Sequence, residues 1–395
     1  ATARAFDAHV AARLAEPEKL PERDRSPNRR LKIGWLTSDI RSHAVGAFVN
    51  PLFVHFDTAR AQHVVYYNFR EEDDDTRAVK PHIEIWREVT GLGDASLADL
   101  IRADEIDILI DLNGYTSHNR ALVVARKAAP IQLSWLGFPG TSGLSAIDYL
   151  LIPPDPVLEK GNWCSETPWP LPDCYGIRTQ DTLMDTPIEP GLPCERNDRP
   201  FTFACFNHFR KVSADCVELW RQILKATPGS HLELVAVGGK DDDTIDYFKR
   251  LFTDSGIDGE RIHIRGYQSR ENYFRSYNDI DLCLDPFPFN GGTTGYDSLW
   301  MGVPFVTLPG EHLAARMGRA MLNAIGLPEL IARDAQDYVN LAVSLFHDHD
   351  RLRTLRAGLR EKMRASPLMD VPRLARALEE AFSGMWHRYL EQTGS

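Results

Sequence analysis

Several features that would place the chain in a common class are missing from its sequence. No run of about eighteen apolar residues occurs, so no segment is expected to span a bilayer. Residues 1–19 lack the compact apolar segment of a secretory signal and predict an amphipathic helix instead. HExxH, GxGxxG and GxxxxGKS are all absent, so zinc proteases of that type, dinucleotide oxidoreductases and P-loop enzymes lack their fingerprints.

The chain has fewer basic than acidic side chains. The chain has 45 Lys and Arg against 56 Asp and Glu, which gives a formal net charge of −11. Such a surface does not attract nucleic acid or an anionic membrane, and we expect neither as a partner. No metal-binding motif stands out either, because the acidic run at 241–243 is typical of a solvated loop. We therefore expect no metal.

Cysteine is also sparse, with six residues in 395 and no CxxC pair. A low density in a large chain predicts free thiols in a reducing compartment, so we expect a cytoplasmic protein. Some of the cysteines fall within the irregular segment 160–196, where a disulfide or a metal site is the alternative. The six are Cys164, Cys174, Cys194, Cys205, Cys216 and Cys283.

What the sequence does contain, from residue 31 onward, is a series of short apolar runs that alternate with helix-like segments. The runs are almost continuously hydrophobic, as in parallel strands that are covered on both faces. The segments between them carry apolar residues at helical spacing. This pattern predicts strands at 32–37, 63–68, 106–112, 131–136 and 148–152, with helices at 45–56, 97–103 and 120–127.

The pattern breaks over residues 153–200, which are rich in proline and predict a linker or a long loop. Alternation then resumes, and the region from 312 to the end is expected to be almost wholly helical. The second array predicts strands at 201–206, 232–237, 262–265, 281–285 and 304–308, with helices at 214–226, 244–253, 270–278 and 294–301.

Two such arrays predict an α/β protein with two doubly wound domains facing each other. In sheets of this kind ligands bind at the carboxyl ends of the strands, so the loops that follow the strands are the places to search. The expected organisation is a helical lead-in at 1–30, an N-terminal domain at 31–170, a linker at 171–200, a C-terminal domain at 201–368 and a C-terminal helix at 369–395.

The sharpest local signal is DPFPFNGGTTGYDSLWMGVPFVTLPGE, where a predicted strand leads through a glycine turn into a helix. Gly291 and Gly292 let the backbone approach a ligand closely. Thr293 and Thr294 add hydroxyls to the unpaired N–H groups at the helix start. This arrangement predicts an anion site, with a simple threonine-capped turn as the alternative. Asp297 lies one turn further in, near enough to accept a ribose hydroxyl.

A second signal, ACFNHFRKVS, runs from an apolar strand into a loop that holds His208, Arg210 and Lys211. A point charge at the carboxyl end of a strand can neutralise a diphosphate leaving group. The alternative is a solvated basic loop.

Two further strand ends carry polar loops. In GWLTSDIRSHAVGAF, a helix-capping turn explains Ser38 and Asp39, whereas an imidazole such as His43 beside a helix start can meet a phosphate or a sugar hydroxyl. In SWLGFPGTSG, a tight loop with its backbone open to a sugar and a plain surface turn are equally compatible with the residues.

Taken in this order, the segments resemble the catalytic region of the O-linked N-acetylglucosamine transferase family, which includes bacterial homologues and plant SPINDLY-type fucosyltransferases. The resemblance covers about residues 31–390. It is carried by SDIRSHAVGAF, DILIDLNGYTSHNRALVVARKAAPIQLSWLGFPGTSGLSAIDYL, FACFNHFRKVS, DLCLDPFPFNGGTTGYDSLWMGVPFVTLPGE and AIGLPELIA.

The resemblance implies a GT-B architecture, in which the active site lies in the cleft between two Rossmann-like domains. It also implies an inverting displacement without a metal or other cofactor, a UDP-sugar donor and a protein or peptide acceptor. His43 matches the active-site histidine of the first loop, Asp39 an acidic residue discussed as a proton acceptor, and Lys211 the lysine that contacts the diphosphate. Gly137 and Pro139 match the loop beside the sugar.

The remaining matches concern the nucleotide. They place His208 near the ribose, Arg270 and Tyr273 at the nucleobase, Thr293 and Thr294 at the diphosphate, and Asp297 at the ribose.

The chain departs from the pattern at two places. The best-known members of the family carry His before the two threonines, whereas this chain has Gly292, as in the SPINDLY-like pattern. The sugar therefore stays open among N-acetylglucosamine, glucose and fucose. The tandem helical repeats that usually precede the catalytic region are absent, and His9 matches a histidine of their last helix.

These observations predict transfer of N-acetylglucosamine from UDP-N-acetylglucosamine to Ser or Thr hydroxyls of proteins. Three alternatives share the fold: an asparagine-modifying N-glucosyltransferase, an O-fucosyltransferase and a non-catalytic module that binds nucleotide sugars. The proton acceptor is Asp39, His43 or a phosphate oxygen of the donor, and the sequence does not choose among them.

Overall fold

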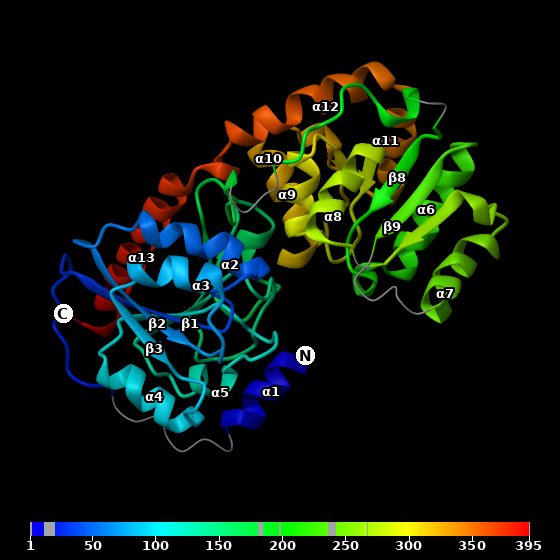
Figure 1. Ribbon diagram of the computed structural model, residues 1–395. Coiled ribbons are helices and arrows are strands. Elements are labelled where there is room, and N and C mark those ends of the chain that lie inside the picture. Colours follow the sequence, from blue (N-terminus) through cyan, green and yellow to red (C-terminus); the bar gives the residue numbers. More distant parts are fainter. Residues whose placement is uncertain are drawn as a thin grey trace. The chain divides into compact units, whose positions relative to one another are not determined.

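The computed structural model divides the chain into two compact units. Unit 1 comprises Ala1–Thr179 together with Asp370–Ser395, and unit 2 comprises Gln180–Met369. Each unit is built around its own parallel sheet (Figure 1). The structure describes residues 2–11, 20–180, 185–196, 199–235, 242–266 and 268–394.

The sheet of unit 1 has seven parallel strands in the order β3-β2-β1-β4-β5-β6-β7. Strand β1 lies in the interior of this sheet and is almost fully buried, and Trp35 on it lies level with Val65 of β2 and Ile110 of β4. The strands are β1 (Leu31–Thr37), β2 (Ala61–Tyr67), β3 (Ile85–Glu88), β4 (Ile108–Asp111), β5 (Ile131–Ser134), β6 (Tyr149–Ile152) and β7 (Thr167–Pro170).

Helices cover both faces of this sheet. Figure 1 shows α2 and α3 on one face and α4 and α5 on the other, as right-handed crossovers require. The last described helix, α13, also belongs to unit 1, where its Phe382 ring meets Trp35 of β1 edge-on. The helices are α1 (Thr2–Ala11), α2 (Ala44–Val49), α3 (Asp74–Val79), α4 (Asp94–Ala103), α5 (Ala121–Val124) and α13 (Val371–Thr393).

The sheet of unit 2 has five parallel strands in the order β10-β9-β8-β11-β12. They are β8 (Thr202–Cys205), β9 (His231–Val235), β10 (Ile262–Arg265), β11 (Leu282–Leu284) and β12 (Phe305–Val306). The helices are α6 (Ala214–Ala226), α7 (Asp242–Thr253), α8 (Arg270–Ser276), α9 (Thr293–Trp300), α10 (Met317–Ala324), α11 (Ala335–His347) and α12 (His349–Arg364).

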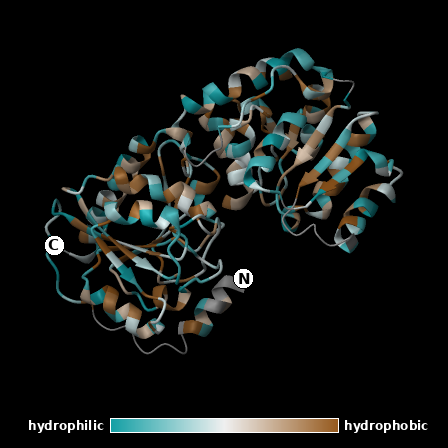
Figure 2. Ribbon diagram, in the orientation of Figure 1, coloured by the Kyte–Doolittle hydropathy of each residue, from teal (hydrophilic) through white to brown (hydrophobic). Residues whose placement is uncertain are grey.

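The hydrophobic residues concentrate on the strands and on the sheet-facing sides of the helices, as the colouring of Figure 2 shows. The continuous apolar runs that predicted parallel strands are therefore buried on both faces, and the α/β class is confirmed. Among the described residues, no helix has both the length and the apolar character that a bilayer crossing needs. All six cysteines are free thiols, as predicted.

Several predicted elements have different limits or were missed. The helix predicted at 45–56 ends at Val49 and continues as a 3-10 turn, Asn50–Val54, because Pro51 has no amide hydrogen to continue the α-helical ladder. The helix predicted at 120–127 shrinks to one turn, Ala121–Val124. The prediction of an irregular segment at 153–200 was wrong in part, since Thr167–Pro170 pairs with β6 as an edge strand. Proline is tolerated there because an edge strand needs no second ladder.

The strand Ile85–Glu88 and the helix Asp74–Val79 were also missed, because both are short and rich in polar residues. Among the described residues of the predicted lead-in, helix α1 occupies Thr2–Ala11, and residues 20–30 contain no helix. The predicted strand 232–237 and the acidic run 241–243 lie partly outside the described residues.

Candidate active site

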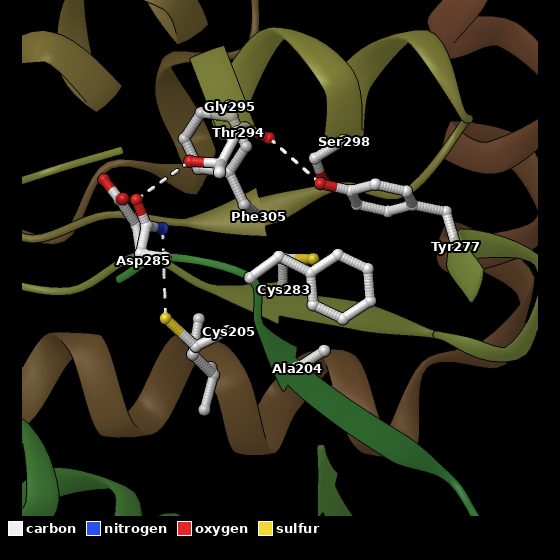
Figure 3. Close-up of a pocket in the computed structure, with 12 residues that line it drawn as sticks. Ala204, Cys205, Tyr277, Cys283, Asp285, Thr294, Gly295, Ser298 and Phe305 are labelled. Carbon is white, nitrogen blue, oxygen red and sulfur yellow. Dashed lines mark hydrogen bonds between the residues drawn. The ribbon is translucent and has the colours of Figure 1, made fainter. Parts of the chain in front are cut away.

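In unit 2, the strand order reverses direction between β8 and β11, so the loops after these two strands meet at one point of the sheet edge. The Thr294 hydroxyl at the start of α9 donates to Oδ1 of Asn207, just after β8, at 2.9 Å. Figure 3 shows Thr294 and Asp285 turned toward each other above Cys205 and Cys283. The two segments singled out in the sequence are therefore brought together by the fold.

Asp285 holds the glycine turn between β11 and α9 in place through hydrogen bonds. The Gly291 amide donates to Asp285 Oδ1 at 2.7 Å, and the Thr307 hydroxyl donates to Asp285 Oδ2 at 2.7 Å. A Cβ atom on Gly291 would lie 2.6 Å from the Thr294 hydroxyl, so the protein itself requires glycine there. A Cβ on Gly292 would meet nothing within 4 Å.

Lys211 reaches the same turn from the loop after β8. It ends the 3-10 turn Phe209–Lys211, and its ammonium donates to the carbonyl of Asn290 at 2.9 Å while lying 4.2 Å from the centre of the Phe289 ring. Burial lowers the pKa of this ammonium, and the charge of Asp285 opposes that shift. A half-buried cation thus stands beside the backbone amides of a helix start, which is an arrangement suited to a phosphate group.

Asp285 is fully enclosed. Burial raises its pKa to about 7, against the opposing effects of the Gly291 and Thr307 hydrogen bonds and of Lys211. The neutral form keeps both hydrogen bonds, because one carboxyl oxygen accepts from the Gly291 amide and the other can donate to the Thr307 hydroxyl. The two hydrogen bonds that hold the turn therefore persist in either charge state of Asp285, although burial disfavours the ionised form.

The predicted nucleoside contacts lie on α8 and α9. The Tyr273 hydroxyl donates to Asp297 Oδ2 at 3.1 Å and shares a hydrogen bond of 2.8 Å with Tyr277. Burial raises the pKa of Tyr273 well above its usual value. Asp297 is buried, whereas Arg270 at the start of α8 is exposed. His208 is also exposed, and its Nδ1 accepts from the Arg210 amide at 3.1 Å.

In unit 1, the order reverses between β1 and β4, and the loops after these strands are again joined by side chains. Asn113, after β4, donates to Asp39 Oδ2 and to the Ser38 hydroxyl, each at 2.9 Å. The Ser38 hydroxyl in turn donates to Asp39 Oδ1 at 2.8 Å. Asp39 is 3% exposed, so its carboxylate is enclosed by its own loop and by Asn113.

His43 caps the first turn of α2. Its Nδ1 accepts from the Val45 amide at 3.2 Å and lies 3.6 Å from Asp39 Oδ2. Burial lowers the pKa of His43, an effect that the charge of Asp39 opposes and that of Arg41 reinforces. With Nδ1 engaged as an acceptor, this hydrogen-bond network assigns the proton of the neutral ring to Nε2. The free side of the ring is then a hydrogen-bond donor.

The loop after β5 approaches the same edge. A Cβ atom on Gly137 would lie 1.9 Å from the Leu112 carbonyl oxygen and 3.4 Å from Val45, so only glycine fits between β4 and the start of α2. Pro139 follows in the same loop and is partly exposed.

Within each unit, several of the predicted residues lie near the switch point. Unit 1 brings together Asp39, His43 and Gly137. In unit 2, Lys211 and Thr294 reach the glycine turn and its neighbour Asn207, and Tyr273 meets Asp297, whereas Arg270 and His208 are exposed. His9 lies exposed on α1. No role was predicted for four further polar residues of these loops, although their positions were a signal: Asn113 and Asn207 directly follow predicted strands, Asp285 ends one, and Asn290 precedes the glycine pair.

Among the described residues, no three His, Cys, Asp or Glu side chains gather as metal ligands. The positive groups at the glycine turn are Lys211 and the backbone amides.

Comparison with known proteins identifies the family. The model of glycosyl transferase family 41 matches residues 9–158 and 181–378, which is most of the chain. The chain belongs to glycosyl transferase family 41. The family match includes every residue predicted for the site, and it ends inside α13.

Known proteins are similar to nearly the whole chain. A probable UDP-N-acetylglucosamine–peptide N-acetylglucosaminyltransferase SPINDLY of Hordeum vulgare is 33% identical over 376 residues, which are 92% of this chain and 39% of that protein. The probable enzyme of the same activity named SEC from Arabidopsis thaliana is 30% identical over 385 residues, 95% of this chain and 39% of that protein. The chain thus spans about two fifths of the length of these relatives.

A solved structure agrees. A mutant of Thermobaculum terrenum O-GlcNAc transferase is 32% identical and superposes with a TM-score of 0.88, covering 99% of this chain and 75% of that one. The GT-B fold predicted for the chain is confirmed by this likeness.

Proposed function

We propose that this family 41 protein is an inverting glycosyltransferase that transfers N-acetylglucosamine from UDP-N-acetylglucosamine to Ser or Thr hydroxyls of proteins. The observation that carries the proposal is the cluster at the unit 2 switch point, where Lys211, the Gly291–Gly292 turn and Thr294 converge. The printed activities of the SPINDLY and SEC relatives support the same donor and acceptor.

In the proposed reaction, the acceptor oxygen attacks the anomeric carbon while the bond to the diphosphate breaks. Negative charge grows on the departing diphosphate, and a half-buried ammonium with a helix start beside it stabilises that charge. Asp297 and Tyr273 are proposed to hold the ribose and the base with Arg270 and His208. No divalent cation is proposed, because Lys211 and the amides supply positive charge at the leaving group.

The acceptor hydroxyl must lose its proton during this step. His43 presents its Nε2–H side, so it is suited to donate a hydrogen bond to the donor and not to accept a proton. Both oxygens of Asp39 already accept hydrogen bonds within a buried loop. We therefore propose a phosphate oxygen of the donor as the proton acceptor. The six free thiols support a reducing compartment, the cytoplasm, as the place where the protein works.

Replacing Lys211 tests the assignment most directly. Loss of this contact in Lys211→Ala should cost about 2–4 kcal/mol in the transition state, and so lower kcat/KM by roughly 30- to 1000-fold. Arg210→Ala removes the neighbouring exposed cation and serves as the matched control, with an expected change below about threefold. Equal activity of the Lys211 variant and the wild type would show that Lys211 does not stabilise the leaving group.

The sugar and the acceptor are tested separately. Thermal shifts with UDP, GDP and their sugars should show stabilisation by UDP and UDP-N-acetylglucosamine alone, whereas a shift with GDP would favour fucose. Mass spectrometry of a modified protein should place the sugar on Ser or Thr, and modified Asn would favour an N-glucosyltransferase. Binding of UDP without transfer to any peptide and without slow donor hydrolysis would leave only a nucleotide-sugar-binding module.

A further inference from the structure

Unit 1 has a second feature at the carboxyl edge of its sheet, an open cleft of about 690 Å³. Its walls come from the loops after β2, β3 and β4, and we call it the edge cleft. It is lined by residues of 68–71, 90–94 and 118–120. No residue predicted for the reaction lies in it. Its volume is in the range of sites that bind a ligand of substantial size.

The walls of the edge cleft are tied to one another. The Asn68 amide donates to the carbonyl of His118 at 2.8 Å, which joins the β2 loop to the β4 loop. Arg120 pairs with Asp94 at 2.8 Å and donates to the carbonyls of Val89 and Leu92 at 3.0 and 2.9 Å, which joins the β4 loop to the β3 loop. A cleft with such cross-links is formed in advance, so a ligand does not have to order it.

His118 is held in this wall with an unusual backbone. Its φ is +59°, a left-handed conformation that costs a non-glycine residue about 1 kcal/mol or more. Its ring is exposed and meets the Phe69 ring edge-on at 5.3 Å. Strained residues of this kind concentrate at ligand sites, where the strain fixes the direction of a side chain.

The charges of the edge cleft indicate what it can bind. Arg70 and Glu71 carry opposite charges, and Arg120 is neutralised by Asp94, so the lining has no net charge. A nucleotide or another phosphate would need an excess of positive charge. The remaining lining consists of amide, hydroxyl, imidazole, aromatic and aliphatic groups, which suits a chain without net charge, such as an extended polypeptide.

The edge cleft also adjoins the Asp39–His43 loop. The Arg41 guanidinium of that loop lies 4.3 Å from the centre of the Phe69 ring and 3.6 Å from Asp39 Oδ1. The Ser42 amide donates to Asp73, the N-cap of α3, at 2.7 Å. The loop whose His43 is proposed to donate a hydrogen bond to the donor is therefore continuous with one wall of the cleft.

We propose that the edge cleft binds the acceptor polypeptide, on one side of the residue that receives the sugar. This inference rests on the proposed function. The cleft orients the acceptor chain through its amides and through His118, and it takes no part in holding the donor.

The test fills the cleft without touching its cross-links. Thr90 is exposed and lines the cleft, so Thr90→Trp should block it while leaving the fold intact. His118→Gly removes the ring and suits the left-handed backbone, so it should also fold. Thr58→Trp is the matched control, since Thr58 is exposed at the opposite, amino end of β2.

The substrate is the best-labelled member of an array of Ser- and Thr-containing peptides, incubated with radiolabelled UDP-N-acetylglucosamine and wild-type protein. Thr90→Trp should raise the KM for this peptide at least tenfold and His118→Gly at least threefold. Their donor hydrolysis without peptide should stay within twofold of wild type, and Thr58→Trp should match wild type throughout.

An unchanged peptide KM in both cleft variants, with an active wild type, would overturn the inference alone. Slower donor hydrolysis in Thr90→Trp would overturn it as well, because the cleft would then serve the donor. A wild type that labels no peptide and hydrolyses no donor would contradict the proposed function, and the inference would fall with it.

Discussion

Gly291 and Gly292 are adjacent, but the chain constrains them differently. A side chain on Gly291 collides with the Thr294 hydroxyl and comes within 3.2 Å of Asn207 and Asp285, so the folded protein excludes it. A side chain on Gly292 enters open space in front of the helix start. Only an approaching ligand would be obstructed there.

The two glycines therefore give a matched pair of variants. Gly291→Ala should lower both the melting temperature and the affinity for UDP, because it displaces the hydrogen bonds of the turn. Gly292→Ala should leave the melting temperature within about 1 °C and still weaken UDP binding. Thermal melts and isothermal titration calorimetry measure the two effects. Undiminished UDP affinity in Gly292→Ala would mean that no ligand comes close to this backbone.

Asp285 predicts a dependence of stability on pH. Its folded pKa is raised to about 7 from the usual value of 3.8, so the folded state holds a proton that the unfolded state releases between these values. The contribution of Asp285 to the free energy of unfolding is then fully present below about pH 4 and is lost as the pH rises towards 7. The free energy of unfolding changes by at most about 1.4 kcal/mol per pH unit on this account.

Asp285→Asn mimics the protonated form and should remove this dependence. We expect similar stability of the variant and the wild type at pH 4, and a more stable variant at pH 8. Urea unfolding, monitored by hydrogen exchange in peptides of unit 2, measures the difference in stability between the variant and the wild type. A wild type that gains stability over the variant with rising pH would show that Asp285 is ionised in the folded state.

At the scale of single elements, α13 is separated in sequence from the rest of unit 1 yet packs within it. Glu379 accepts from the Asp57 amide at 2.6 Å, and Trp386 donates to the carbonyl of Ser26 at 3.2 Å. The Arg29 guanidinium lies 4.7 Å from the centre of the fully buried Trp386 ring. This helix therefore belongs to the core of the first sheet and is not an appendage.

Trp386→Ala should accordingly destabilise unit 1 by about 3–5 kcal/mol, the usual cost of deleting a buried tryptophan side chain. Hydrogen exchange should accelerate in peptides from β1 and β2 while those from β8 and β9 stay protected. Trp220→Ala, a fully buried control in α6, should produce the converse pattern. Acceleration in both units by either variant would show that they unfold as one.

The bounds of the helices and strands show how much of the secondary structure the local sequence determines. Helix Ala214–Ala226 and strand Ile262–Arg265 were predicted to the residue. For the helix the reason is that Ser213 caps it and that a complete apolar stripe follows this cap. Strand β7 was not predicted, because its sequence, TPWP, has no strand pattern of its own and pairs only with β6. Pairing with a neighbour, and not propensity, makes it a strand.

At the scale of the whole molecule, the two parallel sheets follow the same plan, with a switch point beside the first strand of each. The proposed roles differ, since the groups suited to a diphosphate lie in unit 2. Adding UDP should therefore slow hydrogen exchange first at 205–212 and 285–300. Protection confined to unit 1 would contradict this assignment of the donor.

The sequence by itself determined the α/β class, the alternation of elements and the family, because burial on both faces leaves continuous apolar runs and because the motifs are local. Only the tertiary structure decided that Asn113 reaches Asp39 and that Asn207 reaches Thr294. These partners lie more than 70 residues apart in the chain. The strand order brings them together, because β4 lies beside β1 and β11 beside β8. This order depends on the side of the sheet on which each connection places the next strand.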